Sequence, residues 1–112
     1  MKPIRVYIAG PISSNPPDHT RTAIHTANYL MALGYVPYVP HLTVFWEMVS
    51  GQKDWETWLT YDEKWLAVCD VLLRLPGESR GADREVAFAG DHGIPVVYGT
   101  TDLERRFPLT AN

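Results

Sequence analysis

The sequence predicts a three-layer α/β fold, in which helices cover both faces of a mostly parallel sheet of four to five strands. The first observation behind this prediction is that short β-branched runs alternate with longer segments of helical periodicity. The second is that these β-branched runs end at glycine or proline, where loops begin. The third is the length of 112 residues, which suits a single domain over 1–112 and leaves little room for a second.

Two strands and one helix are expected in the first part of the chain. In order, they are a buried strand over 4–9, a loop over 12–18, a helix from about 20 to 33, and a short strand over 35–39. Gly34 ends the helix, because glycine readily adopts the left-handed conformation of a helix C-terminus. The strand–helix–strand order favours parallel pairing, since a crossover helix returns the chain to the same end of the sheet.

The second part of the chain repeats the alternation. In order, we expect one or two helical turns over 42–49, a polar connector over 50–53, a helix over 55–68, a strand over 70–75, a loop over 76–81, a helix over 82–91, a strand over 94–98, and a polar tail over 99–112 with one helical turn at Leu103. Asp54 is a suitable N-cap for helix 55–68. The apolar stripe of that helix comprises Trp55, Trp58, Leu59, Trp65, Leu66 and Cys69. We expect the four tryptophans of the chain to lie mostly in the core.

The predicted sheet is of the flavodoxin or Rossmann type, which binds ligands beyond the carboxyl ends of its strands. Three stretches follow such ends: the loop after Tyr7–Gly10, the segment around Pro40 and His41, and the loop 77–81 with the helix that it precedes. We therefore expect a binding site where these three stretches meet.

Composition and charge exclude several classes of protein. Ten Lys+Arg against thirteen Asp+Glu give a net charge of −3 without a basic cluster, which argues against a nucleic-acid polymer as partner. No apolar run approaches the roughly 18–20 residues that span a bilayer, and no signal peptide is recognisable. The single cysteine, Cys69, excludes an internal disulfide. We expect a cytoplasmic protein that has no membrane partner and binds a small anionic molecule.

Metal and cofactor chemistry are not expected. The four histidines show no paired ligand spacing, and no His-Glu-x-x-His motif is present. Neither a Walker A sequence nor Gly-x-Gly-x-x-Gly occurs, so the nucleotide-triphosphatase and dinucleotide-cofactor interpretations lose their main support.

Glu85 is the first candidate for chemistry. The expected helix over 82–91 places it in the first helical turn, where the helix dipole favours an ionised carboxylate. An ionised carboxylate in a ligand cleft can act as a nucleophile. The alternative is that Glu85 only stabilises the start of its helix.

Asp62 is the second candidate, because it interrupts an apolar stripe. It lies four residues after Trp58 and three before Trp65, so an unpaired carboxylate there is costly unless it faces a cavity. Desolvation raises the pKa of a carboxyl group, which suits a general acid. The alternative is a slightly rotated helix with Asp62 at its wet edge. Two carboxyl groups in different environments are typical of glycosidic-bond cleavage.

The remaining candidates surround these two carboxyl groups. Tyr7 either hydrogen-bonds a catalytic carboxylate or is a core residue, and His41 either lines the pocket or is structural. Backbone N–H groups, hydroxyls and one arginine can together hold an anion at a helix start. The residues expected to contact the substrate are Gly10, Pro11, Ile12, Ser13, His41, Ser79, Arg80 and Gly81.

These residues occur in three blocks that together resemble the nucleoside 2-deoxyribosyltransferase superfamily. The blocks are Tyr7-Ile8-Ala9-Gly10-Pro11-Ile12, the run from Asp62 to Asp70, and Ser79-Arg80-Gly81-Ala82-Asp83-Arg84-Glu85. The resemblance covers 7–97, and it is greater to the branch that contains 2′-deoxynucleoside 5′-monophosphate N-glycosidases.

The resemblance implies a role for each matching residue. Glu85 corresponds to the nucleophile, Asp62 to the acid/base, and Tyr7 to the tyrosine beside the nucleophile. Ser79 stands where the nucleotide hydrolases have a phosphate-contacting serine and the transferases have an aspartate, which would repel a phosphate dianion. The loop after Gly10 departs from the hydrolases, because it carries Pro11 and lacks their nearby arginine and glycines.

The function implied is an N-glycosidase that cleaves the base–sugar bond of a (deoxy)nucleoside 5′-monophosphate without a cofactor. Two alternatives stay open: a transferase that exchanges bases, and a sensor that binds a nucleotide without cleaving it. Members of this superfamily complete each site with residues from a neighbouring subunit, so the resemblance also implies a homodimer.

Overall fold

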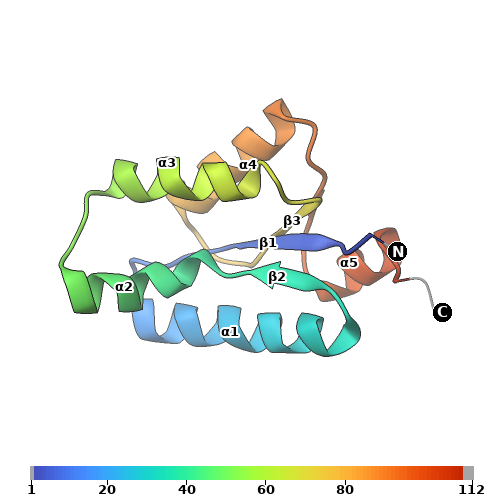
Figure 1. The fold of residues 1–112 in the computed structure, drawn as a ribbon, viewed down its shortest axis with the longest axis horizontal. Coiled ribbons are helices and arrows are strands. Elements are labelled where there is room, and N and C mark those ends of the chain that lie inside the picture. Colours follow the sequence, from blue (N-terminus) through green and yellow to red (C-terminus); the bar gives the residue numbers. More distant parts are fainter. Residues whose placement is uncertain (1, 110–112) are drawn as a thin grey trace.

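A four-stranded parallel sheet forms the central layer of this computed structural model, which describes residues 2–109 (Figure 1). Its strands are β1 (Arg5–Ala9), β2 (Val36–Tyr38), β3 (Val71–Arg74) and β4 (Val96–Val97), and their order across the sheet is β2-β1-β3-β4. Every pairing is parallel. The chain leaves β1 toward β2 on one side and later enters β3 on the other, so the topological switch point lies between β1 and β3.

Helices cover both faces of this sheet, which confirms the predicted three-layer, flavodoxin-like architecture (Figure 1). On one face lie α1 (Pro16–Leu33) and α5 (Thr100–Arg106), and on the other lie α3 (Trp55–Leu66) and α4 (Arg80–Asp91). A 3-10 turn, η1 (Pro40–Leu42), and α2 (Thr43–Ser50) follow β2 and lead the chain to α3. Both are near the edge where the strands end.

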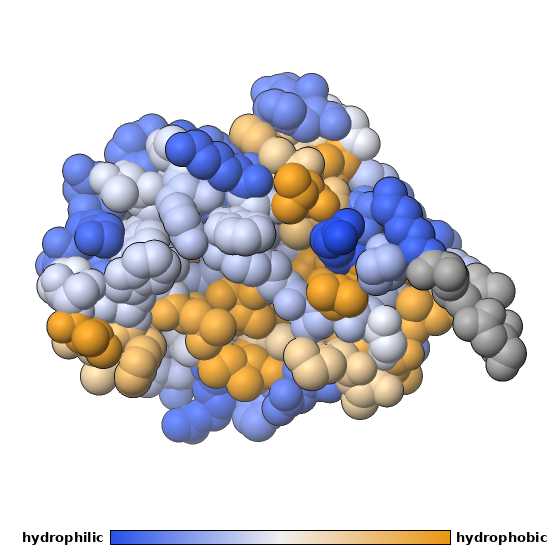
Figure 2. All heavy atoms as spheres, viewed as in Figure 1, coloured by the Kyte–Doolittle hydropathy of each residue, from blue (hydrophilic) through white to orange (hydrophobic). Residues whose placement is uncertain are grey.

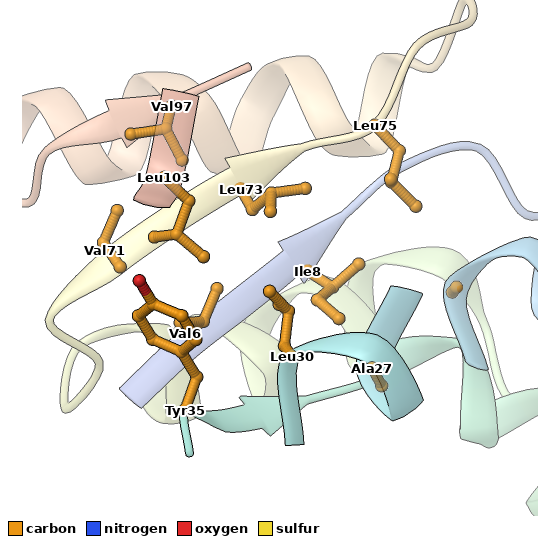
Figure 3. Close-up of a cluster of buried hydrophobic side chains, with 11 residues drawn as sticks. Val6, Ile8, Ala27, Leu30, Tyr35, Val71, Leu73, Leu75, Val97 and Leu103 are labelled. Carbon is orange, nitrogen blue, oxygen red and sulfur yellow. The ribbon is translucent and has the colours of Figure 1, made fainter. Parts of the chain in front are cut away.

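Successive side chains of a strand point to opposite faces, and this alternation divides the core in two. Val6 and Ile8 of β1 pack with Leu30 of α1 and Leu103 of α5 in the cluster shown in Figure 3. Tyr7 and Ala9 point to the other face, where they pack with residues of α3 and α4. The period-two pattern of β1 therefore directs the Tyr7 side chain into the layer that contains α3 and α4.

Helix α1 begins earlier than the sequence analysis predicts. The stretch 12–18 was expected to be a loop, but its prolines occupy the first helical positions, where no N–H donor is needed. Asn15 caps the helix, since its side-chain oxygen accepts a hydrogen bond from the N–H of Asp18 at 3.3 Å. The predicted N-cap Asp54 of α3 is confirmed, because its carboxylate accepts the N–H of Thr57 at 2.7 Å.

Two later boundaries also differ. Helix α4 begins at Arg80 rather than at residue 82, because Ser79 is its N-cap. The tail predicted to be polar with one helical turn contains the seven-residue helix α5, whose Leu103 is fully buried against the sheet. Phe107 and Leu109, which follow the helix, are partly buried against the same core cluster and help to dock this segment.

The prediction that the tryptophans lie mostly in the core is wrong. Trp46, Trp55 and Trp65 are each exposed by 45–49% of their surface. They pack by their ring faces and edges: Trp65 stacks on Tyr38 with 5.6 Å between ring centroids, and Trp46 meets Trp58 edge-on at 5.2 Å.

Among residues 2–109, no helix is both long and apolar enough to cross a membrane.

Candidate active site

A cleft of about 740 Å³ opens at the carboxyl ends of the strands. Its walls come from the loop after β1, from η1 and α2, from α3, and from the first turns of α4. The sequence-predicted residues that line it are Gly10, Pro11, Ile12, Ser13, Asp62, Ser79, Arg80, Gly81 and Glu85. Side chains that lie far apart in the sequence therefore converge on one hollow, as the parallel topology predicts.

Glu85 reaches this cleft from the buried face of α4. It is 5% exposed, and its Oε2 accepts a hydrogen bond from the hydroxyl of Tyr7. Tyr7 is itself fully buried, so both alternatives for this residue hold: it contacts a carboxyl group and it belongs to the core. Burial raises the pKa of Glu85 to about 8, against the effect of the Tyr7 hydrogen bond, which lowers it. The placement in the first helical turn is wrong, because the helix begins at Arg80 and desolvation governs this carboxyl group.

Asp62 reaches the cleft from α3. It is 4% exposed, which contradicts the alternative of a wet helix edge, and its Oδ1 has no hydrogen-bond partner among the residues that the structure describes. Desolvation by burial raises the pKa of Asp62 to about 7. At neutral pH Asp62 is therefore about half protonated, and its unpartnered Oδ1 belongs to a residue that lines the cleft.

The two carboxyl groups influence one another. The charge of Asp62 raises the pKa of Glu85, after burial and the Tyr7 hydrogen bond in importance. Since two carboxylates in one desolvated site repel, the first proton to leave makes the second harder to remove. The pair shares one proton over an interval around neutrality, and nucleophile-plus-acid chemistry requires that this proton lie on Asp62.

The start of α4 forms the polar end of the cleft. Ser79 caps the helix, as its Oγ accepts the N–H of Ala82 at 3.0 Å, and this leaves the hydroxyl proton free to donate. The guanidinium of Arg80 lies over the ring of Trp55, 5.2 Å from its centroid. Within residues 2–109, Arg80 forms no ion pair, whereas Arg74 pairs with Asp83. A helix N-terminus with a free hydroxyl and a free guanidinium suits an anion.

The loop after β1 is held close to the strands that flank it. A Cβ on Gly10 would lie 3.0 Å from the Cβ of Leu75, so glycine permits this close approach. The ring of His41 lies behind the loop, where Nε2–H donates to the carbonyl of Pro11 at 3.1 Å. Burial lowers the pKa of His41 to about 4, which keeps the ring neutral. His41 therefore contacts the backbone of the loop and is not among the cleft-lining side chains.

An ion pair joins the two helices that carry the carboxyl groups. Arg84 Nε donates to Glu63 at 3.1 Å, and its guanidinium also contacts Glu56 at 2.6 Å. Arg84 precedes Glu85 on α4, and Glu63 follows Asp62 on α3. The pair consequently fixes the backbone positions from which both acidic side chains extend.

Sequence reasoning missed Glu47, which lines the cleft from α2. Its Oε2 accepts hydrogen bonds from Nε1 of Trp58 at 2.8 Å and from the N–H of Lys53 at 2.9 Å. No spacing rule links residue 47 to residue 58, because the connector between α2 and α3 sets their approach.

Within residues 2–109, no three His, Cys, Asp or Glu side chains gather closely enough to hold a metal ion.

Comparisons with known proteins place the chain in context. A family model with the description "Domain of unknown function (DUF4406)" matches residues 4–98. No curated protein matches the sequence. Among solved structures, the chain is similar to a 2-desoxiribosyltransferase from Leishmania mexicana, with a TM-score of 0.65 and 18% sequence identity over 98% of this chain and 75% of that one. At this identity, the likeness confirms the deoxyribosyltransferase resemblance for the fold.

Proposed function

The chain belongs to the family described as a domain of unknown function (DUF4406), and we propose that it is an N-glycosidase acting on a (deoxy)nucleoside 5′-monophosphate. The observation that carries this proposal is the convergence of Asp62 and Glu85 on one cleft whose polar end is the start of α4. The two buried carboxyl groups would act on the bond between base and sugar. The helix start beside them would bind the 5′-phosphate of the same substrate.

Glu85 is the proposed nucleophile. Its ionised carboxylate attacks the anomeric carbon, the bond between that carbon and the base nitrogen breaks, and the bonding pair leaves with the base. The hydroxyl of Tyr7 donates to Glu85 and so supports the charged form that attacks. The product of this step is a glycosyl ester on Glu85.

Asp62 is the proposed acid and then base. Its raised pKa keeps the proton available near neutrality, and this proton passes to the departing base. Asp62 then takes a proton from a water molecule that attacks the same carbon and releases Glu85. The sum of the two steps is nucleotide plus water giving free base plus sugar 5-phosphate.

The 5′-phosphate is assigned to the start of α4. Ser79 donates its hydroxyl proton, Arg80 supplies positive charge, and Gly81 offers backbone N–H without a side chain between it and the ligand. The loop Gly10–Ser13 forms the facing wall. His41 positions that loop through Pro11.

A base-exchanging transferase is the second candidate, because the solved structure similar in fold carries that name. Such an enzyme uses the same two carboxyl groups, but a second base takes the place of water in the second step. Supplying an acceptor base and detecting a new nucleoside or nucleotide distinguishes the two activities.

The decisive experiment incubates the protein with a panel of nucleoside 5′-monophosphates and nucleosides and follows free base by chromatography. We expect base release from monophosphates and none from Glu85→Gln, whose fold is checked by circular dichroism. Glu104→Gln is the matched control, since Glu104 also accepts a hydrogen bond from a tyrosine hydroxyl, that of Tyr29, but on the opposite face of the sheet. Full activity in Glu85→Gln contradicts the assigned role.

A homodimer is also proposed. Helix α2 has no buried residue, and its apolar side chains Phe45, Met48 and Val49 are 65–76% exposed. Figure 2 shows hydrophobic side chains at this end of the molecule. Light scattering coupled to size-exclusion chromatography tests the homodimer. We expect the mass of two chains, and the mass of one chain would contradict the proposal.

A further inference from the structure

Tryptophan residues on the two flanks of α3 contact groups of opposite charge in the cleft. On the flank toward α4, Arg80 stacks on Trp55 and is a free cation. On the flank toward α2, Glu47 contacts Trp58. Because the proposed function places the phosphate at the start of α4, and the carboxylate of Glu47 would repel a phosphate dianion, we place the base on the α2 flank.

Glu47 is also well placed relative to the departing base. Trp58, to which it is bonded, lies one helical turn before Asp62 on α3, which corresponds to about 6 Å along the helix axis. Since the proposed mechanism has Asp62 protonate the base, the base must lie next to Asp62. Glu47 and Asp62 line the same cleft, so a base next to Asp62 shares that cleft with Glu47.

The orientation of the Glu47 carboxyl group is fixed by the protein. Both donors, Trp58 Nε1–H and the Lys53 N–H, bond to the same oxygen, Oε2. Oε1 accepts no hydrogen bond from any residue between 2 and 109, yet it is not sealed from solvent. The residue therefore offers one defined acceptor to whatever fills the cleft.

On this basis, which rests on the proposed function, we propose that Glu47 selects nucleotides whose base carries an exocyclic amino group. Cytosine presents N4–H₂ and adenine N6–H₂, and both groups donate to a carboxylate. Uracil and hypoxanthine present a carbonyl at the same position, so they would face Oε1 acceptor to acceptor. A base that covers Oε1 without donating to it removes water from a carboxylate oxygen and leaves that oxygen unpaired, which disfavours such an analogue.

A single substitution can invert this preference. In Glu47→Gln, the amide oxygen must occupy the place of Oε2, because only an oxygen can accept from both Trp58 and Lys53. The amide NH₂ then takes the place of Oε1 and faces the cleft as a donor. The variant should favour bases with a carbonyl at that position.

The experiment compares two matched pairs, cytidine with uridine 5′-monophosphate and adenosine with inosine 5′-monophosphate, in ribose and deoxyribose forms. We expect the wild type to show a kcat/KM about 10- to 100-fold higher for the amino member of each pair. In Glu47→Gln the ratio should fall below one. In Glu47→Ala the discrimination should disappear without inversion, and Glu104→Gln should keep the wild-type ratio.

Calorimetric binding of the same nucleotides to Glu85→Gln protein separates this inference from the proposed activity. If base is released but Glu47→Gln leaves the amino-to-carbonyl ratio unchanged, the assignment of Glu47 is wrong and the glycosidase proposal stands. If no nucleotide is cleaved but binding shows the preference and its inversion by Glu47→Gln, the inference stands and the glycosidase proposal falls. Absence of both cleavage and binding overturns both.

Discussion

The hydroxyl of Tyr7 donates a hydrogen bond to Oε2 of Glu85, across 78 residues of sequence. The tyrosine comes from the middle of β1 and the glutamate from the second turn of α4, so the contact ties the sheet to the helix that carries the proposed nucleophile. This hydrogen bond favours the charged form of Glu85. The position of β1, which carries Tyr7, therefore affects the charge of the proposed nucleophile.

We expect Tyr7→Phe to lower kcat about 10- to 100-fold with a small effect on KM, since the lost hydrogen bond destabilises the carboxylate that attacks. The pKa of Glu85 should rise, so the acid limb of the pH–rate profile should move to higher pH. Steady-state kinetics across pH measure both effects. The control is Tyr35→Phe, which removes a buried hydroxyl that donates to the carbonyl of Phe107 at 2.8 Å on the other face. Equal losses in both variants would mean that Tyr7 acts through stability alone.

The reaction should show a bell-shaped pH profile, because it needs one proton on the pair formed by Asp62 and Glu85. The pKa values of about 7 for Asp62 and about 8 for Glu85 place the maximum near neutrality, and the two limbs report the pair rather than single residues.

In Asp62→Asn, we expect kcat to fall at least about 100-fold and the descending limb to vanish, because no acid remains to lose its proton. The ascending limb should remain and report the pKa of Glu85 alone, which the charge of Asp62 no longer raises. A bell-shaped profile that survives in Asp62→Asn would show that another group supplies the proton.

Much of this arrangement is predictable from local patterns. The β-branched runs give the strands, and their parallel order brings Asp62, Glu85 and the loop after Gly10 to one edge. An aspartate inside an apolar stripe allows either a carboxyl group that faces a cavity or one at a wet helix edge, and the 4% exposure of Asp62 decides for the first.

Other features depend on contacts that no local pattern contains. The first turn of α1 was missed because prolines suit both loops and helix starts, and only the Asn15 cap decides between them. The pKa of Glu85 was expected to be low from the helix dipole, yet burial against the sheet has the larger effect. The approach of Glu47 to Trp58 is set by the connector 51–54, whose conformation the sequence does not specify.

The two carboxyl groups should make the protein progressively less stable as the pH rises from about 4 to about 8. Their pKa values are raised in the folded state, so the folded protein binds protons that the unfolded chain has already released. The free energy of unfolding then falls by about 1 kcal/mol per pH unit for each such group, from the unfolded pKa up to the folded one. The pKa of His41 is lowered to about 4 in the folded protein, so the contribution of His41 makes the protein more stable as the pH rises from about 4 to 6.5.

Glu85→Gln should therefore be more stable than the wild type at pH 8.5, and the difference should shrink toward pH 6.5. Chemical denaturation at fixed pH values measures it, with Glu104→Gln as the control that should track the wild type. A constant difference at all pH values would show that Glu85 is already ionised in the folded protein across this range, so that its pKa is not raised.

Arg84 is expected to position both carboxyl groups through its ion pair with Glu63. Arg84→Gln should reduce kcat several-fold at unchanged KM for the phosphate-bearing substrate, because Asp62 and Glu85 lose their fixed separation. Arg84→Lys should restore part of the loss, since it keeps the charge but not the two-pronged geometry. If Arg84→Gln lowered the melting temperature with kcat unchanged, the ion pair would be structural only.

Ser79 offers a test of the phosphate assignment in which folding and binding can be separated. Ser79→Asp keeps an N-cap for α4, because an aspartate carboxylate also accepts the N–H of Ala82, but it places negative charge beside Arg80. We expect little change in melting temperature and at least about a 100-fold loss in kcat/KM for monophosphates, while activity on free nucleosides is kept or gained. Ser79→Ala should instead lower stability by about 1 kcal/mol through the lost cap and reduce monophosphate activity less. If Ser79→Asp cleaved monophosphates as fast as the wild type, the phosphate would have to bind elsewhere in the cleft, and the preference for nucleotides over nucleosides would lose its basis.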